Sequence, residues 1–267
     1  MYKTILVFAA LAGSLVAVAS DEHYNIPLWE SGKVPLAAGN GPLDEPFLTV
    51  FLPPENKRNG TSVIIAPGGS NIMLMYGLEG IEVAERFNDW GTTAFVLTYR
   101  LSPRYGEAAR VLDGNRAMRL VRSRAKEFKL DPNKIVFAGF SAGSSMARSV
   151  AAAAGPGDAS APDPVDRLDS KPNYLLMVYS AGRATPGEKL KEFPPTFLLA
   201  AAYDRGAANG SAQLFLDMNK AGGVAEIHIY QKGRHGFGAA TTSPEFSPWM
   251  DVFKHFLKVG GYFGGSK

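Results

Sequence analysis

Short apolar segments recur along the sequence, and each is followed by a turn and an amphipathic stretch. Most are rich in Val, Ile, Leu and Phe without strict alternation, which is typical of strands covered by helices on both faces. The predicted strands span residues 47–52, 62–66, 93–98, 135–140, 174–178, 196–201 and 226–229. Apolar residues at helical spacing predict helices over 80–90, 107–128, 144–154, 212–221 and 249–257. Strand then helix, five times over, predicts an α/β fold with a mostly parallel sheet and helices on both faces.

The chain has 267 residues, of which 46% are hydrophobic and 20% charged, an ordinary composition for a globular domain. A chain of this length buries roughly three quarters of the surface that its unfolded form exposes. A single domain over residues 21–267 is therefore expected to fold without a metal or a crosslink. The absence of cysteine means that no disulfide contributes to its stability.

The first twenty residues differ from the rest. Lys3 gives a basic start, residues 4–19 are almost wholly apolar, and Ala17-Val18-Ala19 is a small-x-small site before polar residues. This layout predicts a secretory signal peptide over residues 1–20, and hence a secreted or periplasmic protein. An uncleaved membrane anchor is the alternative, although the stretch is short for a bilayer, which needs about 20 apolar residues. No other segment is apolar enough to cross a membrane.

The strongest catalytic motif is Gly139-Phe140-Ser141-Ala142-Gly143, between a predicted strand and an Ala-rich helix. A nucleophile elbow requires this context, because a sharp strand-to-helix turn exposes the serine hydroxyl and small neighbours let the backbone close up. The following helix directs its N-terminus at the serine, which favours developing negative charge there. Ser141 is therefore the predicted nucleophile.

The base must come from one of four histidines. His23 precedes the core elements, His228 lies in a strand pattern and His255 lies in the last helix. His235 alone lies in a glycine-punctuated loop after the last predicted strand, where a hydrolase of this kind carries its base.

The acid should lie between the nucleophile and the base in chain order. Asp204 follows the apolar run at 196–202 directly, whereas Asp163, Asp166 and Asp169 lie in a Pro-rich excursion and Asp217 lies in a helix pattern. Asp204 is the predicted third member, which would hold the imidazole in one tautomer and stabilise its protonated form.

An oxyanion hole needs two backbone N–H donors. One belongs to the residue after the nucleophile, here Ala142, and the other to a loop after an earlier strand. The strand at 62–66 runs into Pro67-Gly68-Gly69, so the second donor is assigned to Gly68 or Gly69.

Charge and spacing exclude several other functions. The formal net charge is +3, and the densest basic run, residues 116–129, is interleaved with apolar residues at helical spacing. We interpret this run as a solvated helix face rather than a nucleic-acid patch. No Cys, His or carboxylate cluster has metal-ligand spacing, and no glycine-rich loop has a phosphate-binding pattern, so neither a metal nor a cofactor is expected.

Together these motifs identify an α/β-hydrolase fold, and nearly the whole chain after the leader resembles the acetyl xylan esterase and feruloyl esterase group of α/β hydrolases. Members of that group are often labelled xylanase-like although they cut ester side groups. The motifs that carry the resemblance are Pro67-Gly68-Gly69, Glu79-Gly80, and residues 94–101, 116–125, 131–132, 139–143, 165–172 and 235–238.

The resemblance implies a serine esterase that removes acetyl groups from carbohydrate, with Ser141, Asp204 and His235 as its triad. The chain departs from the group at Ser70-Asn71, where a third glycine and a tyrosine are usual, at Tyr203, where a second aspartate is common, and after the elbow at Ser144-Ser145. Substrate choice is therefore less constrained than reaction type.

No large lid is expected, since the excursion at 155–172 is too short and Pro-rich for a helical cap. The expected partner is an ester on an oligosaccharide or polysaccharide, with no nucleic acid and no membrane after leader removal. Two alternatives stay open: a general short-chain carboxylesterase, and a catalytically silent hydrolase fold used for binding.

Export provides a direct test of the leader. Exported protein is expected to begin near Ser20 or Asp21, because the small-x-small site ends there. N-terminal sequencing of exported material measures this, and an intact Met1 in a membrane fraction would instead establish the anchor.

Overall fold

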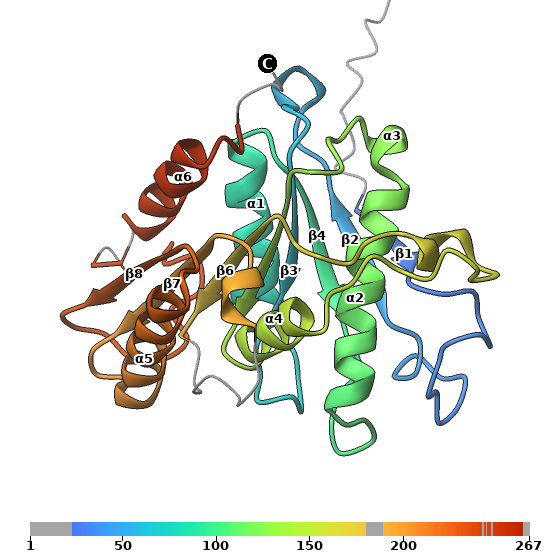
Figure 1. Ribbon diagram of the computed structural model, residues 1–267, viewed down its shortest axis with the longest axis horizontal. Helices are drawn as coiled ribbons and strands as arrows, with labels where there is room; N and C mark the ends of the chain where they lie inside the picture. Colours follow the sequence, from blue (N-terminus) through green and yellow to red (C-terminus); the bar gives the residue numbers. More distant parts are fainter. Residues whose placement is uncertain (1–22, 180–188, 242, 244, 247, 264–267) are drawn as a thin grey trace, which may run out of the picture.

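The computed structural model describes residues 23–179, 189–241, 243, 245, 246 and 248–263 (Figure 1). The leader lies outside the described residues, so its cleavage stays a prediction. Within the described ranges, no helix is both long and apolar enough to cross a bilayer.

A single eight-stranded sheet forms the centre of the molecule, in the order β1-β2-β4-β3-β5-β6-β7-β8. The pairings β1·β2 and β2·β4 are antiparallel, and all pairings from β4 to β8 are parallel. The strands are β1 (Tyr24–Pro27), β2 (Phe47–Phe51), β3 (Ser62–Ala66), β4 (Thr93–Thr98), β5 (Ile135–Phe140), β6 (Tyr174–Val178), β7 (Thr196–Ala201) and β8 (Ala225–Tyr230). The predicted mostly parallel sheet is confirmed.

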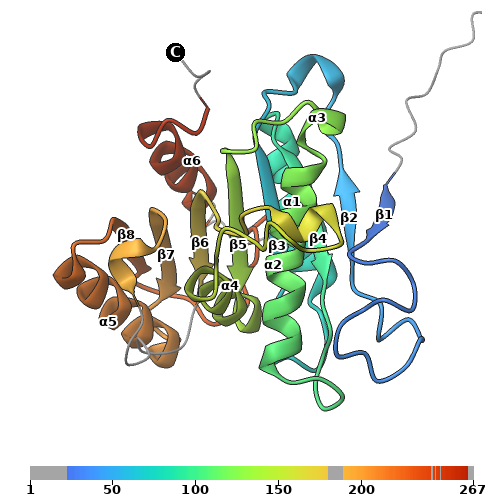
Figure 2. The ribbon, with the colours of Figure 1, turned by 45° about the vertical axis from the view of Figure 1, so that its right-hand side comes forward.

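Helices cover both faces of this sheet, as Figures 1 and 2 show. Helices α1 (Glu82–Asp89) and α6 (Trp249–Val259) pack in one apolar cluster with one face of the strands. Helices α2 (Glu107–Ser123), α4 (Ala142–Ala152) and α5 (Arg205–Ala221) pack in a second cluster on the other face. The shorter helices are η1 (Glu55–Lys57), the π-helix η2 (Tyr76–Ile81), α3 (Ala125–Phe128), η3 (Pro164–Arg167) and η4 (Leu190–Glu192).

The central strands are buried on both faces, which explains their lack of alternation. In β5, Val136, Ala138 and Phe140 belong to one cluster and Ile135 and Phe137 to the other, all at most 1% exposed. Apolar residues are therefore needed at every position of such a strand.

Several boundaries differ from the predicted ones. Strand β1 was not predicted, because only Ile26 of its four residues is buried and it leaves no apolar run. Helix α5 begins at Arg205 rather than at residue 212, because the side chain of Asp204 caps it by accepting from the amide of Ala207. The helix predicted over 107–128 is two helices, since the chain leaves the helical ladder at Arg124.

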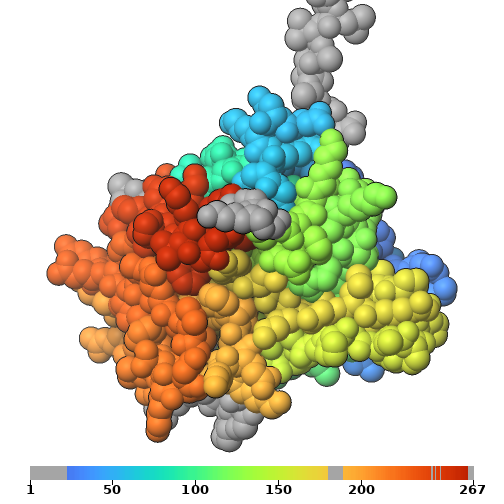
Figure 3. Space-filling model, turned by 45° about the horizontal axis from the view of Figure 1, so that its top comes forward, coloured from blue at the N-terminus to red at the C-terminus, as the bar shows by residue number. Residues whose placement is uncertain are grey.

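The interpretation of residues 116–129 as a solvated face is wrong for its first half. Arg116 is 6% exposed at its side chain and forms ion pairs with Asp163 and Asp166 at 2.5 and 2.8 Å. Arg119 and Arg122 donate to backbone carbonyls of the same excursion. Figure 3 shows this excursion lying against α2. The arginines thus hold the excursion on the side of the domain, and it forms no helical cap.

A fully buried ion pair connects β4 to α2. Arg100, which follows β4, and Asp113 of α2 both have side chains with 0% exposure, and their closest N–O distance is 2.6 Å. Arg100 also donates to the carbonyl of Ala109, and the Asp113 carboxylate accepts from the backbone amide of Arg100. Each charge is thus desolvated and depends on the other.

Asp113→Asn is expected to lower the free energy of unfolding by about 3–5 kcal/mol, because the Arg100 guanidinium stays buried without its counter-charge. Urea unfolding measures this. Asp89→Asn is the matched control, since Asp89 pairs with Arg86 at 3.4 Å on an exposed face, where such pairs contribute about 0–1 kcal/mol. Equal losses in the two variants would contradict the role given to burial.

Candidate active site

The predicted nucleophile lies at the turn between β5 and α4, near the middle of the sheet. Ser141 has φ 52° and ψ −114°, a conformation that non-glycine residues rarely adopt. Its amide donates to the carbonyl of Val178 at 3.0 Å, and its carbonyl accepts from the amides of Ser144 and Ser145. Hydrogen bonds on both sides therefore hold the strained turn, as a nucleophile elbow requires.

Gly143 allows α4 to pack closely on the end of β3. A Cβ atom built at Gly143 would lie 2.0 Å from the carbonyl oxygen of Ala66 and 2.8 Å from that of Pro67. A larger residue would force the helix away from the strand. The second glycine of the motif is thus explained by a backbone contact.

His235 bridges Ser141 and Asp204. Its Nε2 lies 2.7 Å from Ser141 Oγ, and its Nδ1 lies 2.5 Å from Asp204 Oδ2. Since an ionised carboxylate only accepts, Nδ1 carries the proton and Nε2 is left to accept the serine proton. The side chains of His235 and Asp204 are 47% and 17% exposed, so the imidazole opens to solvent while its acid is largely covered.

Each of these side chains is fixed by its own element. Asp204 follows β7 and is also the cap of α5, so one carboxylate oxygen faces the helix and the other faces His235. The loop at residues 233–238, which carries His235, is anchored by Phe237. The side chain of Phe237 is 8% exposed, stacks on Phe246 and packs edge-on against Tyr179. The structure therefore brings together all three residues that the sequence motifs single out.

Two of the other histidines and Asp217 have partners elsewhere. His228 bonds to Glu226 and stacks on Phe197, and the ring of His23 lies tilted against that of Phe51. Asp217 accepts from Gln213. Among the described residues, no group of three or more His, Cys, Asp or Glu side chains could hold a metal ion.

The loop after β3 that begins Pro67-Gly68-Gly69, here called the oxyanion loop, contains two glycines with different roles. The amide of Gly68 donates to Glu79 Oε2 at 2.6 Å, so the assignment of Gly68 as an oxyanion donor is not compatible with this structure. Neither the amide of Gly69 nor that of Ala142 donates to a described residue. These two amides are left for a developing oxyanion.

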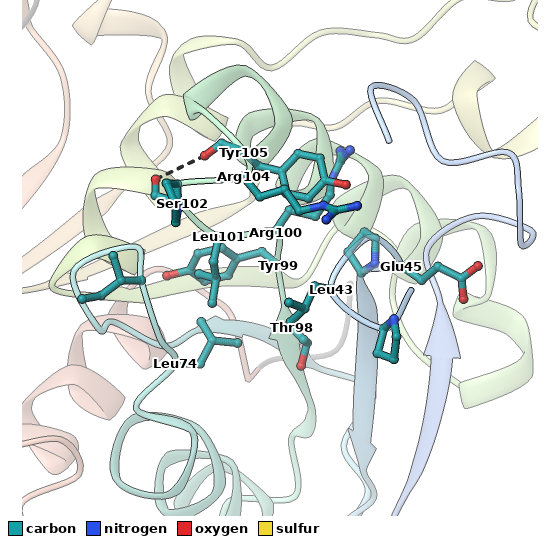
Figure 4. Close-up of a pocket in the computed structure, with 14 residues that line it drawn as sticks. Leu43, Glu45, Leu74, Thr98, Tyr99, Arg100, Leu101, Ser102, Arg104 and Tyr105 are labelled. Atoms are coloured by element: carbon teal, nitrogen blue, oxygen red, sulfur yellow. Dashed lines mark hydrogen bonds between the residues drawn. The ribbon is translucent and has the colours of Figure 1, made fainter. Parts of the chain in front are cut away.

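An apolar pocket of about 360 Å³ opens beside this loop (Figure 4). Ile72 and Leu74 of the loop line it together with Leu43, Tyr99 and Leu101. Figure 4 shows the carboxylate of Glu45 directed away from Leu74 and Leu101. Tyr99 also donates to the carbonyl of Pro67, which connects the pocket wall to the oxyanion loop.

Comparison with known sequences finds one family and two relatives that this chain resembles. Residues 48–162 match the family described as BD-FAE. The chain is 29% identical to an acetylxylan esterase of Xylanibacter ruminicola over 219 residues, and 24% identical to an endo-1,4-beta-xylanase B of Butyrivibrio fibrisolvens over 254 residues. These alignments cover 73% and 83% of this chain but only 44% and 39% of the relatives, so the chain spans less than half of each relative.

Solved structures show the same fold. An acetyl ester-xyloside bifunctional hydrolase from Caldicellulosiruptor lactoaceticus has a TM-score of 0.82 at 28% identity, with 90% of this chain and 97% of that chain covered. A thermophilic esterase of Thermogutta terrifontis has a TM-score of 0.69 at 20% identity, with 88% and 98% covered, and shows the fold alone. The α/β-hydrolase fold and the predicted resemblance to acetyl xylan esterases are confirmed.

Gly68→Ala is expected to slow covalent modification of Ser141 by a phosphonate serine reagent at least about 10-fold. The added Cβ would push the loop away and displace the neighbouring Gly69 amide, and loss of one oxyanion donor costs about 10²–10³ in rate. The added Cβ would lie 2.6 Å from the Phe140 carbonyl oxygen and 2.7 Å from Ser141 Cβ. Mass spectrometry follows the labelling. Gly77→Ala is the control, because a Cβ at Gly77 contacts nothing within 4 Å; equal slowing in both variants would contradict the packing argument.

Proposed function

We propose that this protein is a serine esterase that removes short acyl groups, chiefly acetyl, from acetylated plant carbohydrate such as xylan. The observation that carries the proposal is the continuous hydrogen-bonded chain from Ser141 through His235 to Asp204 at a strained strand-to-helix turn. The sequence and structural relatives support the same chemistry. With the predicted leader, we also propose that it acts outside the cytoplasm.

Acylation begins with attack of Ser141 Oγ on the ester carbonyl carbon. His235 Nε2 takes the serine proton as the bond forms and then gives it to the departing alcohol oxygen of the sugar. Asp204 holds the imidazole and stabilises its protonated form. The product of this half-reaction is an acetylated Ser141 and a free sugar hydroxyl.

Deacylation repeats the sequence with water as the nucleophile. His235 takes a proton from water, hydroxide attacks the acetyl carbonyl, and the proton returns to Ser141 Oγ as acetate leaves. In both halves the amides of Gly69 and Ala142 would donate to the oxyanion, and the N-terminal end of α4 adds its positive dipole. No cofactor is needed for this chemistry.

The openness of the site favours a short acyl group on a sugar. The excursion at 155–172 is held on the side of α2, and the side chain of His235 is 47% exposed among the described residues. An open site suits a small acyl group on a bulky alcohol. The names of the relatives, an acetylxylan esterase and an acetyl ester-xyloside hydrolase, agree with acetylated xylan.

A substrate panel tests the function. Acetylated xylan and acetyl esters are expected to be hydrolysed at least about 10-fold faster than esters of about eight carbons, because no large apolar lid among the described residues is available to bury a longer chain. Each pair of methylenes left in water forgoes roughly 1.6 kcal/mol of apolar burial, or about 15-fold. The panel also includes feruloylated sugars and small chromogenic esters, with acetate or alcohol release measured by initial rates.

Ser141→Ala is the matched control, since only residual catalysis of about 10³–10⁴-fold over water survives loss of a triad member. Retention of a tenth of wild-type turnover would contradict the nucleophile. Preference for long acyl chains would instead assign the pocket lined by Ile72 and Leu74 to the acyl group. Faster turnover of small lipophilic esters than of sugar esters would indicate a general carboxylesterase, and no turnover of any ester would indicate a binding protein.

A further inference from the structure

A buried carboxylate lies behind the oxyanion loop. Glu79 is 2% exposed, and its two oxygens have separate partners. Oε2 accepts from the amide of Gly68 at 2.6 Å, and Oε1 accepts from the hydroxyl of Tyr179 at 2.6 Å. One side chain thus connects the loop after β3 to the residue after β6.

Tyr179 continues this connection to the catalytic histidine. Its ring is fully buried and lies 4.7 Å, centroid to centroid, from the imidazole of His235. Its hydroxyl oxygen accepts from the amide of Gly238 at 3.2 Å, in the same loop as the histidine. The hydrogen bonds therefore run from Gly68 through Glu79 and Tyr179 to Gly238, and both ends of this path adjoin the reacting groups.

The directions of these bonds are defined by their partners. A backbone N–H group can only donate, so Glu79 accepts from the N–H of Gly68, and the Tyr179 oxygen accepts from the N–H of Gly238. Tyr179 must then use its single proton toward Glu79. Burial, followed by the nearby Glu79, raises the pKa of Tyr179 well above its usual 10, so the hydroxyl keeps that proton.

Burial of the Glu79 carboxylate carries a desolvation cost. Burial raises its pKa from the ordinary 4.5, against the opposing effects of Tyr179, Gly68 and His235. No lysine or arginine in the described ranges forms an ion pair with it within 4 Å. It lies on the π-helix η2. Such π-helical turns are rare in proteins overall, and those that occur are often found at functional sites. The carboxylate is needed because it accepts from two buried donors at once, one on each of two loops.

We propose that Glu79 and Tyr179 are positioning residues of the active site. One shared hydrogen-bond path through them fixes the loop after β3, which carries Gly68, relative to the loop after β8, which carries His235. The proposal rests on the proposed esterase function. By fixing the amide of Gly68, Glu79 sets the orientation of the next peptide, whose N–H belongs to Gly69 and is free for the oxyanion. Through Tyr179 and Gly238, the same carboxylate fixes the loop and the ring of His235.

Glu79 also contributes charge. Its negative charge interacts with that of a protonated His235, which forms in each half of the reaction. The other titratable groups around this path are Asp204, which bonds to His235, Tyr99, whose hydroxyl donates to Pro67, and Tyr179 itself. Glu79 and Asp204 are the two carboxylates of this set, so loss of Glu79 removes one of the two groups whose ionised form favours the imidazolium.

Two isosteric variants separate charge from geometry. Glu79→Gln removes the charge and leaves the amide unable to accept from both Gly68 and Tyr179, so kcat is expected to fall about 30-fold while KM changes less than about threefold. Tyr179→Phe keeps the ring and removes only the hydroxyl, so kcat is expected to fall about 10-fold. Because both act on one path, the double variant should be only about twofold slower than Glu79→Gln, whereas independent sites would multiply to about 300-fold.

Two controls match these changes outside the site. Glu82→Gln makes the same substitution three residues later, at a carboxylate that accepts from Thr241 on the surface. Tyr262→Phe removes another buried tyrosine hydroxyl, which donates to the carbonyl of Ser62 at the other end of β3. Both are expected to keep kcat within about twofold, and Tyr262→Phe gauges how far lost stability alone affects the rate.

A second readout does not depend on activity. The chain has four histidines, so the imidazole Cε1–H signals are few enough to assign by NMR with a His235→Gln reference. Glu79→Gln is expected to move the titration midpoint of His235 to lower pH by about half a unit or more, and Tyr179→Phe to leave it nearly unchanged. A role limited to stability would move neither midpoint.

The outcomes distinguish this proposal from the esterase function. If wild type hydrolyses no ester but Glu79→Gln still moves the His235 midpoint, the positioning network stands and the function fails. If wild type is an esterase but kcat is unchanged in both variants, or their effects multiply, the network is overturned. If Glu79→Gln does not fold, Tyr179→Phe against Tyr262→Phe decides, and equal turnover in those two variants overturns the proposal.

Discussion

The parallel pairing of β3 with β5 is the constraint on which the active site depends. Its register places Ala66 opposite Gly139, so the loop after β3 and the turn after β5 leave the sheet at the same level. Gly143 then allows α4 to approach the carbonyls that end β3. The candidate oxyanion amides of Gly69 and Ala142 and the proposed nucleophile Ser141 consequently lie at the same edge of the sheet. A slip of one residue would both separate them and turn each buried side chain to the opposite face.

The other two residues of the proposed triad depend on the same edge of the sheet. In a parallel sheet the carboxyl ends of the strands meet there, so Asp204 after β7 and His235 after β8 reach Ser141 from neighbouring strands. Apolar burial on both faces holds the strands rigidly, because α1 and α6 close one face and α2, α4 and α5 the other. The rigid strands thus fix the positions of the loops, and the loops carry the polar side chains of the site.

The features that could be predicted from the sequence are those with a local pattern. The central strands are continuous apolar runs, and Ser141, Asp204 and His235 each follow such a run in a distinctive turn, so motif and strand indicate the same positions. Strand β1 has no such run, and it exists only because β2 offers it an antiparallel edge. The start of α5 differs from the predicted one because its cap is Asp204, which the sequence motifs indicate only as a member of the proposed triad.

Interactions between distant residues could not be predicted in the same way. Arg116 looks like a helix-surface cation until the excursion 47 residues later supplies Asp163 as its partner. Gly68 and Gly69 are equivalent as sequence, and only the carboxylate of Glu79, 11 residues on, separates their roles. Glu79 belongs to Glu79-Gly80, one of the motifs shared with the acetyl xylan esterase group, yet no neighbouring residue indicates that its side chain is buried. A glutamate followed by glycine, directly before an amphipathic helix pattern and within about a dozen residues of an oxyanion loop, is a signal that could have found it. A carboxylate at that place can satisfy two donors that no backbone group reaches.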